Sequence, residues 1–359
     1  RGWDCSVPSW RHDVEDEADL VEEVLRIYGF DEIPSTPLKL ETAIPTGAVN
    51  QLQERRALAR RILAARGITE AVTFSFLSGE HARLFGSISD SIKLVNPISS
   101  DLDVMRPSLL PNLIIALKKN ADRGFPDGSL FELGPQYYGE MPEDQVISIA
   151  GVRQGRISPR NWAVNSRDFD VFDVKADVLD VLSKVGISIS DLKVNTDTPA
   201  WYHPGRSGSV GKVAKNVFAF FGEIHPSVLK NFDIESRMVG FEIFLDTLPL
   251  SKQDIIRNHK KLEVSPYQTV ERDFAFIIDK HVLAESLINA VQAADKNLIT
   301  DIKVFDLFLG EGIEEGKKSI AISALMQPVG ATFTDAEIEA VCNKIIANVK
   351  KETGGVLRS

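Results

Sequence analysis

Arg272-Asp273-Phe274-Ala275-Phe276-Ile277-Ile278 is the stretch that decides the fold of the C-terminal region, because it predicts a strand that opens a regular series. The series continues with a helix at 282–294, strands at 299–309 and 318–326, a helix at 334–351 and a short strand at 355–358. The order β-α-β-β-α-β is typical of the ferredoxin-like split fold. Thr334-Asp335-Ala336-Glu337 is a capping box that fixes the start of the second helix. Helices cover one face of such a sheet, and the other face is free to bind.

The region before this module predicts alternating helices and strands. The sequence predicts helices at 51–66, closed by Gly67, and at 109–120 and 175–185. Strand-like segments lie at 71–77, 91–95, 129–133, 146–153, 217–224 and 239–245. Antiparallel strands flanked by helices place the chain in the α+β class.

An acidic helix lies within residues 11–29, near the start of the chain. At about 100° per residue, Asp19, Glu22 and Glu23 share one helical face, and Asp13 in the preceding turn could supply a fourth carboxylate. Carboxylates this close repel one another, so they need protonation, arginine partners or a hard cation such as Mg²⁺. The alternative is a solvated acidic face eased by Arg26.

Composition is that of a globular protein. The chain has 359 residues, enough for two or three domains, with 43% hydrophobic and 26% charged residues and no apolar run long enough to span a membrane. The net charge of −10 excludes indiscriminate nucleic-acid binding, so any RNA contact must rest on local patches. Two distant cysteines suit a reducing cytoplasm, where we expect the protein to reside. The opening residues predict that the chain begins inside a domain, as a fragment would.

The N-terminal segment resembles the β subunit of bacterial phenylalanyl-tRNA synthetases. The resemblance rests on Pro8-Ser9-Trp10-Arg11-His12-Asp13 and on Glu17-Ala18-Asp19-Leu20-Val21-Glu22-Glu23-Val24-Leu25-Arg26-Ile27-Tyr28-Gly29-Phe30-Asp31-Glu32-Ile33-Pro34. It implies that four carboxylates are Mg²⁺ ligands at the contact with the α subunit: Asp13, Asp19, Glu22 and Glu23.

The middle region is similar to the class II synthetase-like core of the same family, which serves as a scaffold and α-subunit interface. The resemblance is carried by Val95-Asn96-Pro97-Ile98-Ser99-Ser100, Met105-Arg106-Pro107-Ser108-Leu109-Leu110-Pro111, Phe131-Glu132-Leu133-Gly134, His203-Pro204-Gly205-Arg206-Ser207 and Phe221-Gly222-Glu223-Ile224-His225-Pro226.

This core is predicted to be non-catalytic. In a working class II site, arginines bind ATP, and one of them closely follows a strand that contains Phe-Glu. Here the strand with Phe131-Glu132 is followed by Pro135-Gln136-Tyr137-Tyr138, which contains no arginine. The late strand at 239–245 also has no glycine-rich segment that ends in arginine. His203 and Arg206 could contact phosphate, but without a nearby nucleophile or carboxylate in the sequence a structural turn is favoured.

The C-terminal module resembles the ferredoxin-fold anticodon-binding domain that ends the family's β subunits. The resemblance is carried by Tyr267-Gln268-Thr269-Val270-Glu271-Arg272-Asp273, Phe305-Asp306-Leu307-Phe308, Glu315-Gly316-Lys317-Lys318-Ser319 and Gly354-Gly355-Val356-Leu357-Arg358.

The resemblance implies that Phe308 stacks on an anticodon base, as flat aromatic rings suit single-stranded loops. The alternative is a core role for Phe305 or Phe308, and one of them is expected to be core because strand neighbours three apart face oppositely. The segment is net acidic, so its affinity alone should be modest. We expect five cations near phosphate: Arg272, Lys303, Lys317, Lys318 and Arg358.

Taken together, the resemblance covers nearly the whole chain. It implies the end of a Mg-binding domain at 1–38, the pseudo-catalytic core at 39–252 and the anticodon-binding domain at 265–359. It also implies an α₂β₂ heterotetramer that uses ATP to attach phenylalanine to tRNA(Phe), with the chemistry in the α subunit. One rival is a free-standing RNA-binding or regulatory paralogue. Another is a self-sufficient class II ligase, against which the missing arginines argue.

Overall fold

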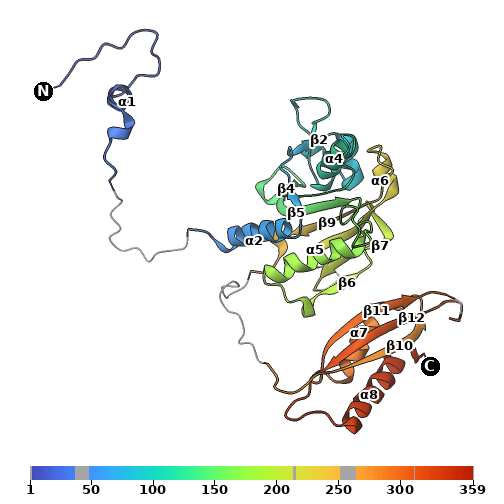
Figure 1. Cartoon of the computed structure of the whole chain (residues 1–359). Helices are drawn as coiled ribbons and strands as arrows, with labels where there is room; N and C mark the ends of the chain where they lie inside the picture. The colour runs from blue at the N-terminus through green and yellow to red at the C-terminus, as the bar shows by residue number, and fades with distance from the viewer. Residues whose placement is uncertain (1, 37–47, 213–215, 251–263, 311, 359) are drawn as a thin grey trace. The chain divides into compact units, whose positions relative to one another are not determined.

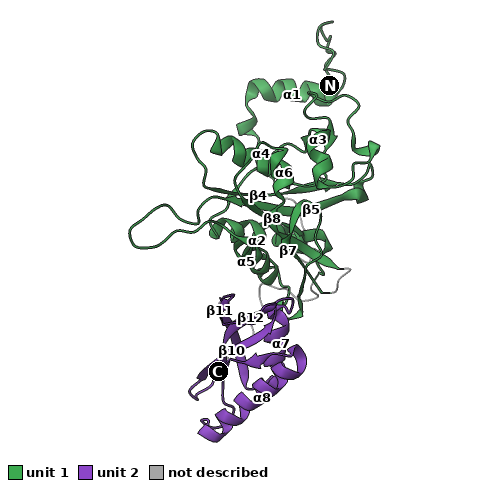
Figure 2. Cartoon of the chain, turned by 90° about the vertical axis from the view of Figure 1, so that its right-hand side faces the viewer, with its two compact units in different colours: residues 1–255 green, residues 256–359 purple. Residues whose placement is uncertain are grey.

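The computed structural model describes residues 2–36, 48–212, 216–250, 264–310 and 312–358. The chain divides into two compact units, residues 1–255 and 256–359 (Figures 1 and 2). The expected domain limits at 38–39 and 252, and the polar linker at 251–261, lie outside the described residues. In the described part of the chain, no helix is long and apolar enough to cross a membrane.

The first unit is built on a seven-stranded sheet with the order β1-β4-β5-β9-β8-β7-β6. Neighbouring strands in this sheet are antiparallel except for β1 and β4, which are parallel. A separate two-stranded ribbon pairs β2 with β3. The strands are β1 (Thr69–Glu70), β2 (Phe76–Leu77), β3 (Val104–Met105), β4 (Gly128–Tyr137), β5 (Gln145–Gln154), β6 (Lys193–Asn195), β7 (Tyr202–Gly211), β8 (Val217–Ile224) and β9 (Met238–Phe244).

Helices cover both faces of this sheet. The helices of the first unit, not all of which lie on the sheet, are α1 (Glu17–Tyr28), α2 (Gln51–Ala65), α3 (Gly79–Ala82), α4 (Leu110–Ala121), α5 (Val171–Lys184) and α6 (Pro226–Lys230). Short 3-10 turns lie at Phe30–Glu32, Arg83–Phe85, Asp90–Ile92, Pro142–Asp144, Ile189–Asp191 and Leu245–Thr247. The helices α2 and α5 pack on one face, and α4 and α6 on the other.

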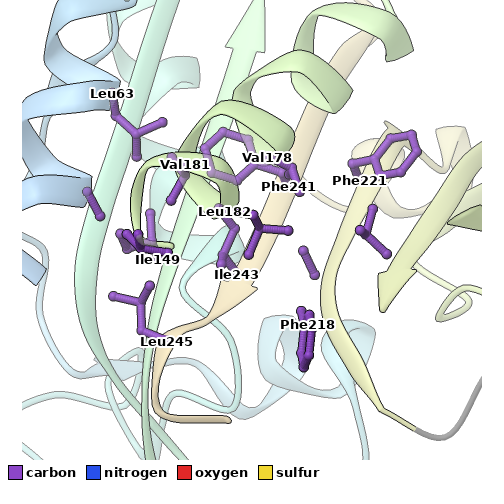
Figure 3. Close-up of a cluster of buried hydrophobic side chains, with 14 of the residues drawn as sticks. Leu63, Ile149, Val178, Val181, Leu182, Phe218, Phe221, Phe241, Ile243 and Leu245 are labelled. Carbon is purple, nitrogen blue, oxygen red and sulfur yellow. The ribbon is translucent and has the colours of Figure 1, made fainter. Parts of the chain in front are cut away.

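The α2/α5 side holds an apolar core. Leu63 from α2 and Val178, Val181 and Leu182 from α5 meet Phe241 and other strand residues there (Figure 3). Side chains alternate between the two faces of a strand, so the even-numbered residues of β4, β5 and β9 lie on the α4/α6 side, and several of them are polar.

Two of the expected strands are wrong. Residues 71–75 are irregular and only β2 remains of the 71–77 segment, while 91–95 contains part of a 3-10 turn and one bridge, Lys93 to Val104. The reason is visible in the first segment: Val72 and Phe74 are 90% and 67% exposed, and the polar Thr73 points inward to Glu132. The alternating apolar side chains of Val72 and Phe74 therefore face outward, and the inward side chain of Thr73 makes a hydrogen bond.

The N-terminal helix α1 begins later than the acidic stretch, after the N-cap Asp16, and Asp13 lies in the turn before it, as expected. No residue of α1 is buried, and its apolar side chains are exposed, including Val24 at 66% and Ile27 at 79%. This helix therefore draws no stability from packing within the described residues.

The second unit confirms the β-α-β-β-α-β order. Its elements are β10 (Val270–Asp279), α7 (Ala284–Ala294), β11 (Ile299–Phe308), β12 (Lys317–Met326), α8 (Asp335–Thr353) and β13 (Val356–Leu357). The sheet order is β11-β12-β10-β13, and a single core cluster joins α7 and α8 to one sheet face. Thr334 caps α8 through the predicted capping box with Glu337.

Candidate functional site

The acidic turn and helix are held together by an arginine. Arg11 donates to both carboxylate oxygens of Asp13, at 2.8–3.2 Å, and also bonds Glu23, which Arg26 reaches at 2.6 Å. Hydrogen bonds from Arg11 lower the pKa of Asp13 to about 2, and those from Arg11 and Arg26 lower the pKa of Glu23 to about 2. Arginine pairing, one of the three remedies considered for crowded carboxylates, is therefore the one present.

The other two predicted ligands are not drawn into this cluster. Asp19 accepts the backbone N–H groups of Asp16 and Glu15 at 2.8 Å, which lowers its pKa. The Glu22 side chain has no hydrogen bond or ion pair within the described part of the chain. No three Asp, Glu, His or Cys side chains of the described residues converge to hold a metal. The structure thus brings two of the four predicted ligands, Asp13 and Glu23, together on Arg11 and leaves the other two apart from them, and the Mg²⁺ role stays a prediction.

The α4/α6 side of the first sheet carries a buried polar network. Glu242, 2% exposed, accepts hydrogen bonds from Ser108 (2.7 Å), Gln136 (3.3 Å), Trp201 (3.2 Å) and Tyr202 (3.3 Å). Desolvation raises the pKa of Glu242 despite these four donors, because no cation lies among them.

Beside this network lies a buried ion pair. Arg106, 2% exposed, donates to Glu132 at 2.7 Å, to Thr73 at 3.1 Å and to the Pro135 carbonyl at 3.0 Å. Arg106 also crosses Gly134, where a Cβ atom would lie 2.5 Å from its guanidinium. The guanidinium of Arg106 is thus bonded by groups of the protein itself.

The loop singled out at 203–207 is part of β7 and is internally bonded. Arg206 makes two hydrogen bonds with Glu223, at 2.6 and 2.9 Å, and the His203 ring accepts from the Gly205 N–H at 3.1 Å. The predicted turn is wrong, because pairing with β8 makes these residues part of a strand, but the contacts fit the favoured structural role of His203 and Arg206.

The second unit presents one uncovered sheet face. Strand alternation places Phe274, Phe276 and Ile278 of β10 against the helices. The odd-numbered residues of β12 therefore face away from the helices. Phe308 pairs with Ser319 and Lys303 pairs with Ser323, so both lie on this open face.

Phe308 stands at the edge of this open face. It is 37% exposed, and the Arg358 guanidinium lies 5.2 Å from its ring centroid. Gly310 lies against the same ring, since a Cβ atom there would come within 2.7 Å of it. An aromatic ring held by a glycine and an arginine offers a flat surface for a base.

The expectation that Phe305 or Phe308 must be core is wrong. Phe305 is 58% exposed, because a register shift between Val304 and Asp306 makes it a bulge residue and breaks the alternation. In addition β11 is an edge strand, so Val304 and Leu307, whose partners on β12 are buried, stay 41% and 55% exposed.

The five predicted cations divide between the two sheet faces. Arg358, Lys303 and Lys317 have the open-face parity, with Lys303 near Asp301 (3.3 Å) and Lys317 near Glu314 (2.6 Å). Arg272 and Lys318 pair with residues of helix-side parity. Lys318 donates to the Lys280 carbonyl at 2.9 Å, and burial lowers its pKa. These two do not join Phe308.

A cavity of about 740 Å³ lies beside the exposed Val72 and Phe74, and sequence reasoning missed it. Its walls are mostly apolar, with Glu80, Asp101 and Lys119 among the polar lining residues. The signal was present in the sequence, since residues 71–77 alternate, but the alternation alone does not say which side faces the core.

Family models match most of the chain. The phenylalanyl tRNA synthetase beta chain CLM domain matches residues 33–245, the ferredoxin-fold anticodon binding domain matches 265–358 and the tRNA synthetase B5 domain matches 1–30.

Curated relatives agree with these matches. Phenylalanine–tRNA ligase beta subunits from Rhodospirillum rubrum, Paramagnetospirillum magneticum and Mesorhizobium japonicum are 47%, 48% and 46% identical over 98–99% of this chain. The matches cover 44–45% of those proteins, so the chain spans slightly less than half of their length.

A pyrrolysyl tRNA synthetase structure, Desulfitobacterium hafniense PylSc, aligns with 64% of this chain and 72% of its own, at 15% identity and a TM-score of 0.41, too low to carry an argument. The family assignment rests on the family models and the curated relatives: the chain belongs to the phenylalanyl-tRNA synthetase β-chain family.

Proposed function

We propose that this chain is part of the β subunit of a phenylalanine–tRNA ligase and supports ATP-dependent attachment of phenylalanine to tRNA(Phe). The single observation that carries the RNA-binding role is the open sheet face with Phe308 and Arg358, in the region that matches an anticodon-binding domain model. The chain then supplies contacts, in a cytoplasmic α₂β₂ assembly whose chemistry resides in the α subunit.

Within this proposal the three parts keep the predicted limits: residues 1–38, 39–252 and 265–359. The middle part is a class II synthetase-like scaffold without catalysis. Support comes from the α4/α6 face of its sheet, where Arg106 is bound to Glu132 and Gln136 to Glu242. The guanidinium of Arg106 is therefore not free to clamp a triphosphate, so the ATP used by the assembled enzyme should not bind this chain alone.

The α subunit is the proposed occupant of the apolar surface around the 740 Å³ cavity. Val72, Phe74 and Ile98 are 67–90% exposed there or in the nearby loop, which is costly unless a partner covers them. Glu80 and Asp101 at the cavity favour a partner with apolar side chains and a neighbouring cation.

Mg²⁺ enters the proposal through Asp13, Asp19, Glu22 and Glu23. Because Arg11 holds Asp13 and Glu23, a metal ion could use both only if Arg11 turned away. Glu22→Gln with Glu23→Gln should therefore weaken the Mg²⁺ dependence of αβ assembly. If assembly and its Mg²⁺ dependence are unchanged in this variant, the acidic face is only solvated and paired.

Co-expression with an α subunit tests the proposal. We expect the two chains to elute together and to attach phenylalanine to tRNA(Phe), while this chain alone shows no pyrophosphate exchange with phenylalanine and ATP. Phe74→Asp should abolish co-elution, and the exposed Val329→Asp in the second unit serves as the matched control. A lone stable chain that binds RNA without recruiting the α subunit would favour the free-standing paralogue instead.

A further inference from the structure

An ordered arm, residues 155–168, extends from the end of β5 toward α5. Its two sides are paired: Arg156 bridges Asp168, the Ile157 N–H donates to the Arg167 carbonyl at 3.0 Å, and Ser166 bonds the Ser158 carbonyl at 2.7 Å. The arm is thus a defined structure rather than a loose connection.

The tip of the arm presents a tryptophan. The Asn161 side chain accepts the backbone N–H groups of Ala163 at 3.0 Å and Val164 at 2.8 Å, which closes the tip in a tight turn. Trp162 belongs to that turn, and its side chain is 99% exposed. The neighbouring Arg160 is also exposed and has no ion pair among the described residues. A fully exposed Trp on a fixed turn is unusual unless it contacts a partner.

The base of the arm borders a cavity of about 140 Å³. Arg156 fixes the arm to the wall by bonding Asp127 through its N–H (3.0 Å) and its guanidinium (3.3 Å). Gly155 makes this approach possible: its φ is +76°, and a Cβ atom there would lie 2.1 Å from an Asp127 oxygen.

The cavity contains an unpaired acceptor. Gln154 is only 6% exposed and lines the cavity, and its side-chain oxygen is buried with no hydrogen-bond partner in the described part of the structure. Buried polar atoms are nearly always bonded, so an orphan of this kind requires an explanation. Asp168 also lines the cavity, as does Asp127, which Arg156 already bonds, so Gln154 and Asp168 favour a ligand that brings N–H donors.

One guanidinium group lies at these acceptors, and two more belong to the loop and the arm that lead away from them. Arg237 lines the cavity and donates to the Phe169 carbonyl at 3.3 Å, and Arg123 lies in the loop that leads to Asp127. Like Arg160, neither has a carboxylate partner within the described residues, although the chain carries a net charge of −10. A protein partner that placed a lysine in the cavity would be repelled by them. A nucleotide carries an amino group, which can donate to the acceptors, and a phosphate, which the arginines can bind.

We propose that the arm and its cavity form a second RNA-contact site, which holds an unpaired nucleotide of the tRNA outside the anticodon. The base stacks on Trp162 or reaches Gln154 with an exocyclic amino group, and Arg160, Arg237 and Arg123 neutralise phosphates. This inference rests on the proposed tRNA-binding function, but it uses a different unit of the chain from the anticodon contact.

The test measures dissociation constants of the assembled enzyme for full-length tRNA(Phe) and for its isolated anticodon stem-loop. Trp162→Ala should weaken binding of full-length tRNA about tenfold and leave stem-loop binding unchanged. Trp162→Phe should retain most of the affinity. Arg61→Ala is the matched charge control, because Arg61 is an exposed arginine of α2 with no ion pair in the described residues, and it should change neither constant.

Gln154→Met provides a second, independent arm of the test. It should weaken binding of full-length tRNA several-fold without lowering the melting temperature, because it removes a buried oxygen that has no partner. By contrast, Phe308→Ala should weaken both RNAs, so failure of the anticodon contact is separable from failure of the arm.

Three results would overturn the inference. In the first, Trp162→Ala and Gln154→Met both bind full-length tRNA normally. In the second, the variants lose the stem-loop as well, which indicates a general folding defect. In the third, Trp162→Ala reduces co-elution of the α subunit while tRNA affinity is kept, which makes the arm a protein contact.

Discussion

Two sheet faces in this chain differ in whether helices cover them. The open face of the second unit exposes Phe308 and Arg358, whereas the α4/α6 face of the first unit buries Arg106, Glu132 and Glu242 under its helices. Both faces carry polar groups on antiparallel strands. The difference is whether these groups have partners: the buried groups are bonded within the protein, while the exposed ring and guanidinium leave a surface for another molecule. Under the proposed function, the covered face belongs to a scaffold and the open face is a binding surface.

The largest effect should come from breaking the buried pair. Arg106→Ala leaves the Glu132 carboxylate buried without its cation, and such a loss costs about 3–5 kcal/mol of unfolding free energy. Denaturant unfolding of the chain measures it. Arg60→Ala is the control, since Arg60 and its partner Glu70 are both partly exposed, at 45% and 37%, and it should cost clearly less. Equal losses would mean that the α4/α6 face is not a tightly satisfied scaffold.

A smaller, pH-dependent effect should come from Glu242. Its pKa is raised in the folded state, so the folded protein binds more protons than the unfolded chain at pH values between about 4.5, the ordinary value, and the raised pKa. Stability from this group therefore falls as the pH rises, by at most about 1.4 kcal/mol per pH unit. Glu242→Gln removes that slope.

The measurement is the unfolding free energy of the parent and of Glu242→Gln from pH 4 to pH 8. We expect the variant to gain stability relative to the parent as the pH rises from about 4.5 to the folded-state pKa of Glu242, and the difference to level off above that pKa. A constant difference between the two proteins would contradict the raised pKa and would indicate that the four donors fully compensate the burial.

The two faces of the second unit's own sheet give the smallest effect. Arg358→Ala should reduce the slope of log Kobs for tRNA against log salt concentration by about one, because it removes one phosphate-neutralising cation. Lys318→Ala should leave the slope unchanged, since Lys318 has helix-side parity and bonds the Lys280 carbonyl. If Lys318→Ala changed the slope as much as Arg358→Ala, RNA would have to reach both sides of the sheet.

Much of the fold follows from the sequence because periodicity and caps are local. The capping box at Thr334 and the β8 segment at 217–224 lie where the sequence predicts them. The irregular 71–75 segment does not, because the choice of the inward side depends on Glu132, about sixty residues away. Strand β7 was missed for a similar reason: its Pro and Gly residues predict a turn, and only pairing with β8 makes it a strand.

The candidate sites were predicted unevenly. Phe308 is on the open face, but its neighbour Phe305 is a bulge residue, and no pattern in β11 announces a register shift that depends on β12. The carboxylates at the N-terminal helix were correctly seen as crowded, but which of them Arg11 binds is a matter of side-chain geometry. Sequence reasoning could list the remedies for this crowding without choosing among them.

The most direct test of the contrast between the two faces is the tRNA(Phe) dissociation constant of the assembled enzyme that carries Phe308→Ala, measured together with the unfolding of the same protein. Base-on-aromatic stacking is worth about 1–3 kcal/mol, so binding should weaken about tenfold or more. The partly exposed ring should leave the melting temperature nearly unchanged, and Phe308→Tyr should bind like the parent. A melted second unit, or unchanged tRNA binding in a folded Phe308→Ala protein, would contradict the account.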